Sequence, residues 1–578
     1  MRPIRLSVLS LLFLLAVLSL ASCGGTRAGE DSALQSDPAA TAATADETAA
    51  STVATTAAAE TATTIEPLAE SVGLSFVSNG DGTCSVSGIG ACTDADVVIP
   101  TKSPAGDPVT GIKDRAFPAA KTIKSVVIPE GVKNVGRFAF YGCESLTAVT
   151  IPDSVTNIGE AAFRGCTELK SVTLGNGIAG IAENLFFHCT SLSAIALPAG
   201  VTSIGNAAFS GCTALSSVTI PEGLKRIGDS VFSGCTALSS VTIPEGVESV
   251  GRSAFSGCTA LPSMTVPDSV TSIGEGAFSG CSSLTAITLP FVGATAGLTE
   301  RDEGQYPFGY VFGKTGYAGG TAREQIYRKD AENWTKETYY VPSSLRSVTI
   351  TGGQLPAGAF YECRDLTSIT VPGDLTKVEA NTFALCISLS SLRLPQSVTS
   401  IGDVAFTGCA ALTSFTIPKN VSSIGLGVFS SCPALENLTV ADGNEYYSVA
   451  GNCLIEVSSG RLLSGCSSSV IPTDGSVTTV EGYSFSANMK AQPYSIVIPE
   501  GVTGIGDYAF YYCAYLSSIT IPASLKKIGE GAFAYCTLLN EIRFQGTQAE
   551  WNAIEKGAGY NDNTGNYAVR CTDGTLNK

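Results

Sequence analysis

The sequence predicts a tandem-repeat solenoid, a single extended domain in which short parallel strands stack coil upon coil. Within each repeat, a segment such as residues 217–221, SVTIP, alternates apolar and polar side chains, which is the pattern of a half-buried strand. A fixed period of this kind is typical of repeat architectures, so 578 residues need not divide into several globular domains. The period is measured by seven cysteines that stand 23 residues apart, each followed by the same apolar string: Cys143, Cys166, Cys189, Cys212, Cys235, Cys258 and Cys281.

The N-terminal segment has the features of a secretory signal. Two arginines precede an apolar run over residues 6–20, and small residues follow. A cysteine directly after Leu-Ala-Ser resembles the lipobox of bacterial lipoproteins, and this resemblance implies that the Cys23 thiol is diacylated and becomes the mature N-terminus. We expect a lipoprotein signal peptide at residues 1–22 and a membrane anchor through lipid. An ordinary signal peptide is the alternative.

Residues 23–71 form the next predicted unit, a lipid-anchored linker. The segment is rich in Ala, Thr, Ser, Asp and Glu and carries few large apolar side chains. Such a tract buries too little apolar surface to offset its chain entropy, so we expect it to be disordered. It would hold the repeat domain clear of the membrane.

Each repeat is predicted to contain one short strand and a return segment. After the strand, residues such as 227–235 lead back to the next strand through a short turn or a single-turn helix, with glycines where the backbone is tight. One repeat cannot fold alone, so stacked repeats must share a core of Leu, Val, Ile, Phe and Cys columns. We place such repeats at residues 121–290, 348–440 and 496–545.

The repeat unit carries a family resemblance. Its pattern, Cys-x-x-Leu-x-x-Val-x-Ile-Pro-x-x-Val-x-x-Ile-Gly-x-x-Ala-Phe-x-Gly, resembles the BspA-type leucine-rich repeat of bacterial surface lipoproteins, over about residues 72–571. The resemblance implies a leucine-rich repeat solenoid, a β-dominated α/β fold. It also implies an N-terminal cap at residues 72–120 and a C-terminal cap at residues 546–578.

The period first breaks in an aromatic-rich insertion at residues 291–347. From Cys281 to Cys363 is 82 residues, whereas three whole repeats would need 69. Aromatic and arginine side chains are the residue types that binding hot spots use, but inserted aromatics can instead form a small core that repairs the stack. Both interpretations stay open for the candidate ligand-binding residues, which are Tyr306, Tyr310, Tyr317, Arg323, Tyr327, Trp334 and Tyr339.

The period breaks again at residues 441–495, which read as a hairpin-like insertion. Two apolar runs there are joined by Ser-Ser-Gly, which is typical of a hairpin. Cys453 and Cys466 could face each other across it and form a disulfide, and Cys84 and Cys92 in the N-terminal cap are a similar candidate pair. Free thiols are the equal alternative for both pairs.

The sequence lacks the residues that most catalytic and metal sites need. Thirteen of the 19 cysteines lie in the repeat ladder, where a buried apolar thiol is favoured, and no Cys-x-x-Cys occurs. His188 is the only histidine, at an exposed turn position, and no phosphate-binding loop is present. The net charge of −17 disfavours nucleic acid. We therefore expect no enzyme, no cofactor and no metal.

These features together predict a secreted surface protein, anchored by lipid at the cell surface or outer membrane. The family resemblance implies adhesion, with host extracellular or bacterial surface proteins as partners, including matrix proteins such as fibronectin and fibrinogen. Two alternatives remain: a structural or envelope-assembly module that uses an exposed row of strand threonines, and a glycan- or mucin-binding protein that uses the aromatic insertion.

Overall fold

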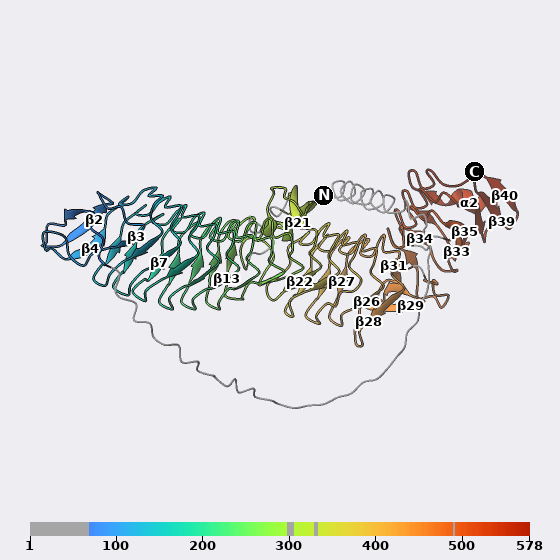
Figure 1. Ribbon diagram of the computed structural model, residues 1–578. Coiled ribbons are helices and arrows are strands. Elements are labelled where there is room, and N and C mark those ends of the chain that lie inside the picture. Colours follow the sequence, from blue (N-terminus) through green and yellow to red (C-terminus); the bar gives the residue numbers. More distant parts are fainter. Residues whose placement is uncertain (1–68, 298–305, 329–332, 467, 489–491) are drawn as a thin grey trace, which may run out of the picture.

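The computed structural model describes residues 69–297, 306–328, 333–466, 468–488 and 492–578. The predicted signal peptide, Cys23 and nearly all of the linker lie outside the described residues. The chain is an elongated solenoid whose coils stack along the long axis, from the N-terminal cap to the C-terminal hairpin (Figure 1). This arrangement confirms the predicted repeat fold. Within the described part of the chain, no helix has the length and apolar character needed to cross a membrane.

Most coils contribute a first strand to a parallel ladder. In β13 (Ser217–Thr219), the Val218 side chain points into the core, whereas its two neighbours are exposed. Val218 pairs with Val241 of the next coil, so each residue stacks on its own copy. The other first strands are β3 (Asp96–Val98), β5 (Ser125–Val127), β7 (Ala148–Thr150), β9 (Ser171–Thr173), β11 (Ala194–Ala196), β15 (Ser240–Thr242), β17 (Ser263–Thr265), β19 (Ala286–Leu289), β22 (Ser347–Ile350), β23 (Ser368–Thr370), β26 (Ser414–Ile417), β28 (Asn437–Val440), β33 (Tyr494–Val497), β35 (Leu516–Ile521) and β37 (Glu541–Phe544).

A second strand, absent from the sequence-based prediction, follows in most coils. In β14 (Arg226–Ile227), Ile227 is buried and pairs in parallel with Val250. Two residues with one apolar side chain are too short to show alternation in a sequence. The other second strands are β4 (Val109–Ile112), β6 (Asn134–Val135), β8 (Asn157–Ile158), β10 (Gly180–Ile181), β12 (Ser203–Ile204), β16 (Ser249–Val250), β18 (Ser272–Ile273), β24 (Lys377–Val378), β25 (Ser400–Ile401), β27 (Ser423–Ile424), β32 (Thr479–Val480), β34 (Gly504–Ile505), β36 (Lys527–Ile528) and β38 (Glu555–Lys556).

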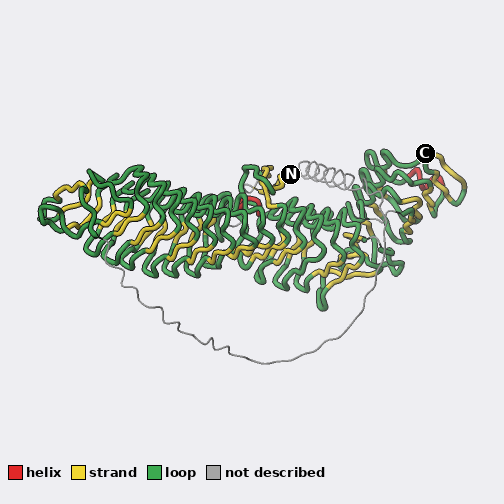
Figure 2. The backbone as a smooth tube through the Cα atoms, viewed as in Figure 1, coloured by secondary structure: helices red, strands yellow, loops and turns green. Residues whose placement is uncertain are grey.

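The third side of each coil, here called the turn side, runs from the second strand to the ladder cysteine. The return is a series of turns, so the turn alternative is the one observed. Successive coils are joined by backbone hydrogen bonds: the Phe232 amide donates to the carbonyl of Ala254, 2.8 Å away. Ser230 adopts a φ of 56°, a left-handed conformation that the surrounding ladder must hold. Figure 2 shows how little helix the described chain contains.

The core is a set of columns, each built from equivalent apolar residues of successive coils. The rings of Phe209 and Phe232 are stacked with centroids 5.6 Å apart, and this column runs unbroken from Phe117 to Phe278. The ladder thiols are buried and unpaired, as predicted. The Cys235 thiol donates to the carbonyl oxygen of Phe209, 3.2 Å away, and burial raises its pKa to about 12.

Both ends of the solenoid are closed by antiparallel hairpins. At the N-terminus, β1 (Ser75–Ser78) pairs with β2 (Cys84–Gly88), and β2 then pairs in parallel with β4. At the C-terminus, helix α2 (Gln548–Ala553) precedes the hairpin of β39 (Ala568–Cys571) and β40 (Gly574–Asn577). These hairpins cover the open ends of the stack, which would otherwise expose apolar side chains and unpaired strand edges.

Candidate interaction site

The repeat ladder passes straight across the first insertion. Strand β19 pairs in parallel with β22, with Ile287 opposite Val348, although some sixty residues separate them in the chain. The insertion therefore leaves the solenoid after β19 and returns to the next coil without breaking the first ladder.

The first part of the insertion takes the place of the turn side between the coils of Phe278 and Phe360. A 3-10 helix, η1 (Phe308–Phe312), lies between two coils: the Phe278 amide donates to the Val311 carbonyl at 2.9 Å. On the other side, the Phe308 amide donates to the Ala359 carbonyl at 2.8 Å, and the Phe308 ring lies 5.2 Å from that of Phe360. This part of the insertion is a coil of the stack.

The second part is a long antiparallel hairpin. Strands β20 (Gly320–Arg328) and β21 (Trp334–Pro342) have nine residues each and pair from Gly320 opposite Pro342 to Arg328 opposite Trp334. The hairpin rises from one edge of the solenoid (Figure 1). It is the largest departure from the repeat in the described chain.

A buried glutamine joins the hairpin to the solenoid. Gln325 has no exposed surface; its Oε1 accepts from the Gly309 amide at 2.7 Å, and its Nε2 donates to the Tyr361 carbonyl at 3.0 Å. A Cβ on Gly309 would lie 2.4 Å from that Oε1, so the close approach requires glycine. The hydrogen bonds satisfy backbone groups of η1 and of the following coil at once.

Ion pairs reinforce the attachment. Arg323 of β20 forms an ion pair with Asp365 of the solenoid. Lys314 lies 2.6 Å from Glu337, which also accepts a hydrogen bond from the Tyr339 hydroxyl at 2.8 Å. Partial burial opposes ionisation of Glu337, but these two hydrogen bonds outweigh it and lower its pKa. The middle of the hairpin is therefore held by polar contacts on both strands.

The structure separates the predicted ligand-binding residues into two groups. Tyr327 and Tyr339 are only 2% and 0% exposed, so they form the small core of the hairpin and are not presented to a ligand. Tyr317 is half-buried and donates to the Tyr340 carbonyl at 2.9 Å. For these three tyrosines, the structure favours the interpretation in which inserted aromatic side chains form a small core that repairs the stack.

The other candidates stay partly exposed. The Tyr306 and Tyr310 rings stack with centroids 4.4 Å apart, and the Tyr306 ring lies 6.0 Å from that of Tyr327 in the hairpin. At the far end, the Arg328 guanidinium lies 5.4 Å from the Trp334 ring centroid. Arg323, in contrast, is committed to its ion pair with Asp365. The partly exposed aromatic and cationic side chains thus form two pairs, Tyr306 with Tyr310 and Arg328 with Trp334.

The second insertion is a three-stranded antiparallel sheet. It consists of β29 (Tyr447–Ala450), β30 (Cys453–Glu456) and β31 (Arg461–Gly465), and β31 continues in parallel into β32. Two hydrophobic cores meet here, one extending from Leu74 to Cys466 and the other from Cys453 to Val569. The insertion is therefore the joint between two sections of the solenoid.

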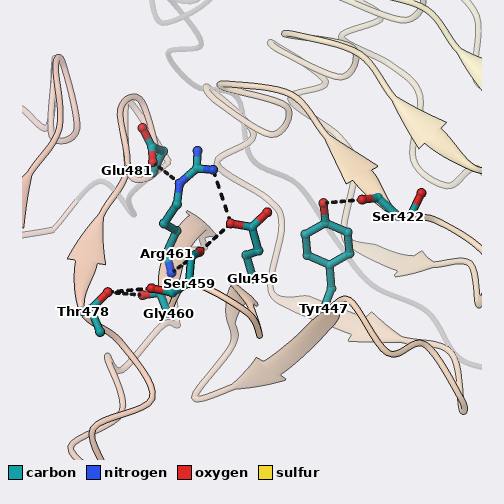
Figure 3. Close-up of polar contacts among 8 residues, drawn as sticks. All are labelled: Ser422, Tyr447, Glu456, Ser459, Gly460, Arg461, Thr478 and Glu481. Atoms are coloured by element: carbon teal, nitrogen blue, oxygen red, sulfur yellow. Dashed lines mark hydrogen bonds and ion pairs between the residues drawn. The ribbon is translucent and has the colours of Figure 1, made fainter.

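Polar contacts hold this joint (Figure 3). Arg461 Nε lies 2.6 Å from Glu481 of the following coil, and its Nη1 lies 3.3 Å from Glu456 of β30. On the other side, the Tyr447 hydroxyl donates to the Ser422 carbonyl at 3.4 Å. The sheet is linked to both sections.

The four cysteines considered for disulfides are free thiols in the structure. Cys453 stands opposite Gly465, so Cys466 is one residue out of register and its side chain leaves the other face of the sheet. The two side chains accordingly belong to different cores. Cys84 and Cys92 are both buried, and the Cys84 thiol contacts the Pro108 carbonyl at 3.5 Å.

Sequence reasoning missed two places on the turn side. Most coils carry Ala, Ser or Gly there, but the first coils carry Phe138 and Tyr141, and late coils carry Tyr508 and Tyr511. The repeat alignment itself contains this signal, as large residues at positions that are otherwise small. His188 lies on the same side and is exposed. The described residues contain no group of three or more His, Cys, Asp or Glu arranged to hold a metal ion.

A sequence profile of the family described as "BspA type Leucine rich repeat region" matches the chain in six copies, over residues 102–216, 203–295, 335–453 and 461–566. A search of curated proteins finds no match.

Several solved structures are similar. A leucine-rich repeat protein from Bacteroides ovatus ATCC 8483 is 21% identical, covering 83% of this chain and 99% of that chain, with a TM-score of 0.39. A leucine rich cell surface protein from Faecalibacterium prausnitzii A2-165 is 27% identical, covering 85% and 98%, with a TM-score of 0.31. A leucine-rich repeat protein from T. pallidum is 30% identical, covering 33% and 88%, with a TM-score of 0.32.

Proposed function

Because the chain belongs to the BspA-type leucine-rich repeat family, we propose that it is a lipid-anchored adhesin that attaches the cell to host matrix or to other cells. The family is one of surface-type repeat proteins whose solenoids bind other proteins. We propose further that Cys23 carries the anchor, that the linker holds the solenoid away from the membrane, and that the protein has no catalytic activity of its own.

One observation carries the proposal: a hairpin that is held along its middle presents a tryptophan and an arginine at its far end. The buried Gln325 and the ion pair of Arg323 restrain the middle of β20. Trp334 and Arg328 lie together at the other end, and both are only half-buried. Tryptophan and arginine dominate protein-binding hot spots, and a restrained loop loses little entropy on binding.

The test uses the chain without its signal peptide and measures saturable binding to immobilised fibronectin, fibrinogen and partner-cell extracts. Replacing both Arg328 and Trp334 by alanine should weaken binding by about tenfold or more. Tyr446→Ala is the matched control, because Tyr446 is an exposed aromatic (52%) outside the first insertion. Absence of saturable binding to every surface ligand, or equal binding by the double variant, would contradict the proposed adhesion site.

A structural role in the cell envelope is the second candidate, favoured by the row of exposed threonines in which Thr219 lies beside Thr242. An uncharged, flat row of this kind is compatible with self-packing. Concentration-dependent light scattering that is unchanged in the Arg328/Trp334 variant, with no ligand binding, would support this role in place of adhesion.

The anchor has a separate test. Mass spectrometry of the mature N-terminus should find a diacylglyceryl group on Cys23, and Cys23→Ala should release the protein from cells. An unmodified cysteine, or cleavage elsewhere, is incompatible with lipidation.

A further inference from the structure

The turn side of the first coils has a hollow of about 460 Å³ lined by Arg115, Pro118, Phe138, Tyr141 and Arg164. We propose that this hollow binds an anionic sugar, a pyranose ring that carries a carboxylate or a sulfate group. The volume is within the roughly 300–1,000 Å³ of small-molecule sites. The site lies far along the chain from the hairpin of the first insertion, and its function does not depend on that hairpin.

The hollow arises where the repeat departs from its usual small residues. Arg115, Phe138 and Ala161 occupy equivalent places in three successive coils, and the middle coils carry Ala207 and Ser230 there. Backbone hydrogen bonds place these residues side by side, because the Phe138 amide donates to the Glu160 carbonyl at 3.0 Å. Because Phe138 is large and the neighbouring Ala161 is small and buried, the surface of the turn side drops between them.

A second row forms the other edge of the hollow. Pro118, Tyr141 and Arg164 are equivalent to Ser210 and Ser233 of the middle coils. The Phe138 and Tyr141 rings meet edge to face with centroids 6.0 Å apart, and Tyr141 is 42% exposed. An open aromatic face of this kind can stack on the apolar C–H face of a sugar ring.

Two arginines provide the positive charge. The Arg115 guanidinium lies 5.3 Å from the Phe138 ring centroid, and that of Arg164 lies 4.5 Å from the Phe187 centroid. Neither has an ion-pair partner among the residues that the structure describes. Guanidinium groups bind carboxylate and sulfate oxygens through paired N–H groups, so two of them flanking a stacking surface suit an anionic ring.

The nearby acidic groups are already engaged and do not cancel this charge. Glu160 forms an ion pair with Arg137, and Glu144 lies 3.2 Å from Lys121. Asp114 keeps its negative charge, but its carboxylate accepts a hydrogen bond from the Arg137 amide at 2.7 Å and forms no ion pair with Arg115 or Arg164 among the described residues. In a chain of net charge −17, an aromatic hollow between two arginines without carboxylate partners is a specific feature.

The geometry favours a sugar over an acidic peptide. One common way to bind an extended peptide is to add it as a strand to a free sheet edge. The backbone of the turn side is already used between coils: the Arg115 amide donates to the Arg137 carbonyl at 2.9 Å, and the Gly142 amide to the Arg164 carbonyl at 2.8 Å. Only side chains are left to bind a ligand here, and they suit a negatively charged group and the face of a ring.

The test uses the chain without its signal peptide and titrates it with four probes by calorimetry or NMR. The probes are N-acetylneuraminic acid, glucuronic acid, 6-sulfated N-acetylglucosamine and neutral N-acetylglucosamine. We expect at least one acidic sugar to bind about tenfold or more tightly than the neutral sugar, and to weaken as salt is added. The carboxylated and sulfated probes distinguish the two sources of the anion.

Variants then locate the site. Replacing Arg115 and Arg164 together by alanine, or Tyr141 by alanine, should each reduce affinity by about tenfold. Replacing Arg226 and Arg252 together by alanine is the charge-matched control, because both are exposed and lie several coils away, and this variant should bind as the parent does. Because these side chains are exposed or half-buried, the variants should fold, which circular dichroism checks.

Three results would overturn the proposal: no acidic sugar binds, the double arginine variant binds unchanged, or an acetylated Asp/Glu-rich peptide binds as well as the best acidic sugar. Failure here is separate from failure of the adhesion site, because the Arg328/Trp334 variant should retain sugar binding.

Discussion

The attachment of the hairpin through Gln325 gives the sharpest test of the structure. In Gln325→Ala, the Gly309 amide and the Tyr361 carbonyl lose their buried partners, which lie at 2.7 and 3.0 Å in the parent. Each buried group left unsatisfied costs about 1–3 kcal/mol. We expect the free energy for opening the hairpin from the solenoid to fall by about 4 kcal/mol, the middle of that range for two groups.

Hydrogen exchange read by mass spectrometry measures this directly. A loss of about 4 kcal/mol raises the opening equilibrium by nearly three orders of magnitude, so peptides that cover η1 and β20 should exchange that much faster. The first strands of distant coils, such as β13, should exchange as before, because each coil contacts only its neighbours.

Glu324→Gln is the matched control. Glu324 is the adjacent residue, is exposed, and pairs only at the surface with Lys336 at 2.6 Å. Such pairs contribute at most about 1 kcal/mol. If Gln325→Ala changes the exchange of η1 and β20 no more than the control does, then the hairpin is not held by this glutamine and the reasoning fails.

Three further predictions concern the solenoid itself. The pKa of the Cys235 thiol is raised to about 12 by burial, so the folded state holds its proton more tightly than the unfolded chain, whose thiols titrate near the ordinary value of 9.0. The contribution of this thiol to the free energy of unfolding should therefore be fully present below about pH 9. It should fall as the pH rises toward 12, by up to about 1.4 kcal/mol per pH unit for each such thiol. Circular dichroism during alkaline titration checks this, and a free energy of unfolding that rises above pH 9 would contradict it. Phe232→Ala removes a fully buried ring from the core column and should lower the unfolding free energy by about 3–5 kcal/mol in urea denaturation, whereas Phe187→Ala, on the half-buried turn side, should cost clearly less. Arg461→Ala should loosen the joint between the two solenoid sections. A double-mutant cycle with Glu481→Gln should give a coupling energy of about 0.5–1 kcal/mol, because the pair is partly exposed. A coupling energy of zero would show that this ion pair does not stabilise the joint.

The regular coils were predictable because each residue packs against its own copy. Phe209, Cys212 and Val218 are buried in one coil for the same reason as in the next, so the 23-residue period alone identifies the core. The second strand was not predictable, because Arg226 and Ile227 are too few to show a pattern. They become a strand only through pairing with the neighbouring coils.

The insertions were harder to interpret. The tyrosines of the first insertion look equivalent in the sequence, yet Tyr327 and Tyr339 are buried while Tyr340 stays partly exposed. The register of the hairpin decides this, because side chains alternate between the two faces of a strand. In the second insertion, one residue of register sends Cys453 and Cys466 to different faces.

The 23-residue period was enough to predict a repeat solenoid, the columns of its core and the places where the period breaks. Those features are local or periodic, so they can be recognised along the chain. What the exceptions do depends on the neighbours that folding gives them. It brings Arg115, Phe138 and Arg164, which lie on three coils, around one hollow, and it joins Gln325 to a coil beyond the insertion. The physical reason is that stacking places equivalent residues about 4.8 Å apart, so a departure from the repeat becomes a site only beside its neighbours in space.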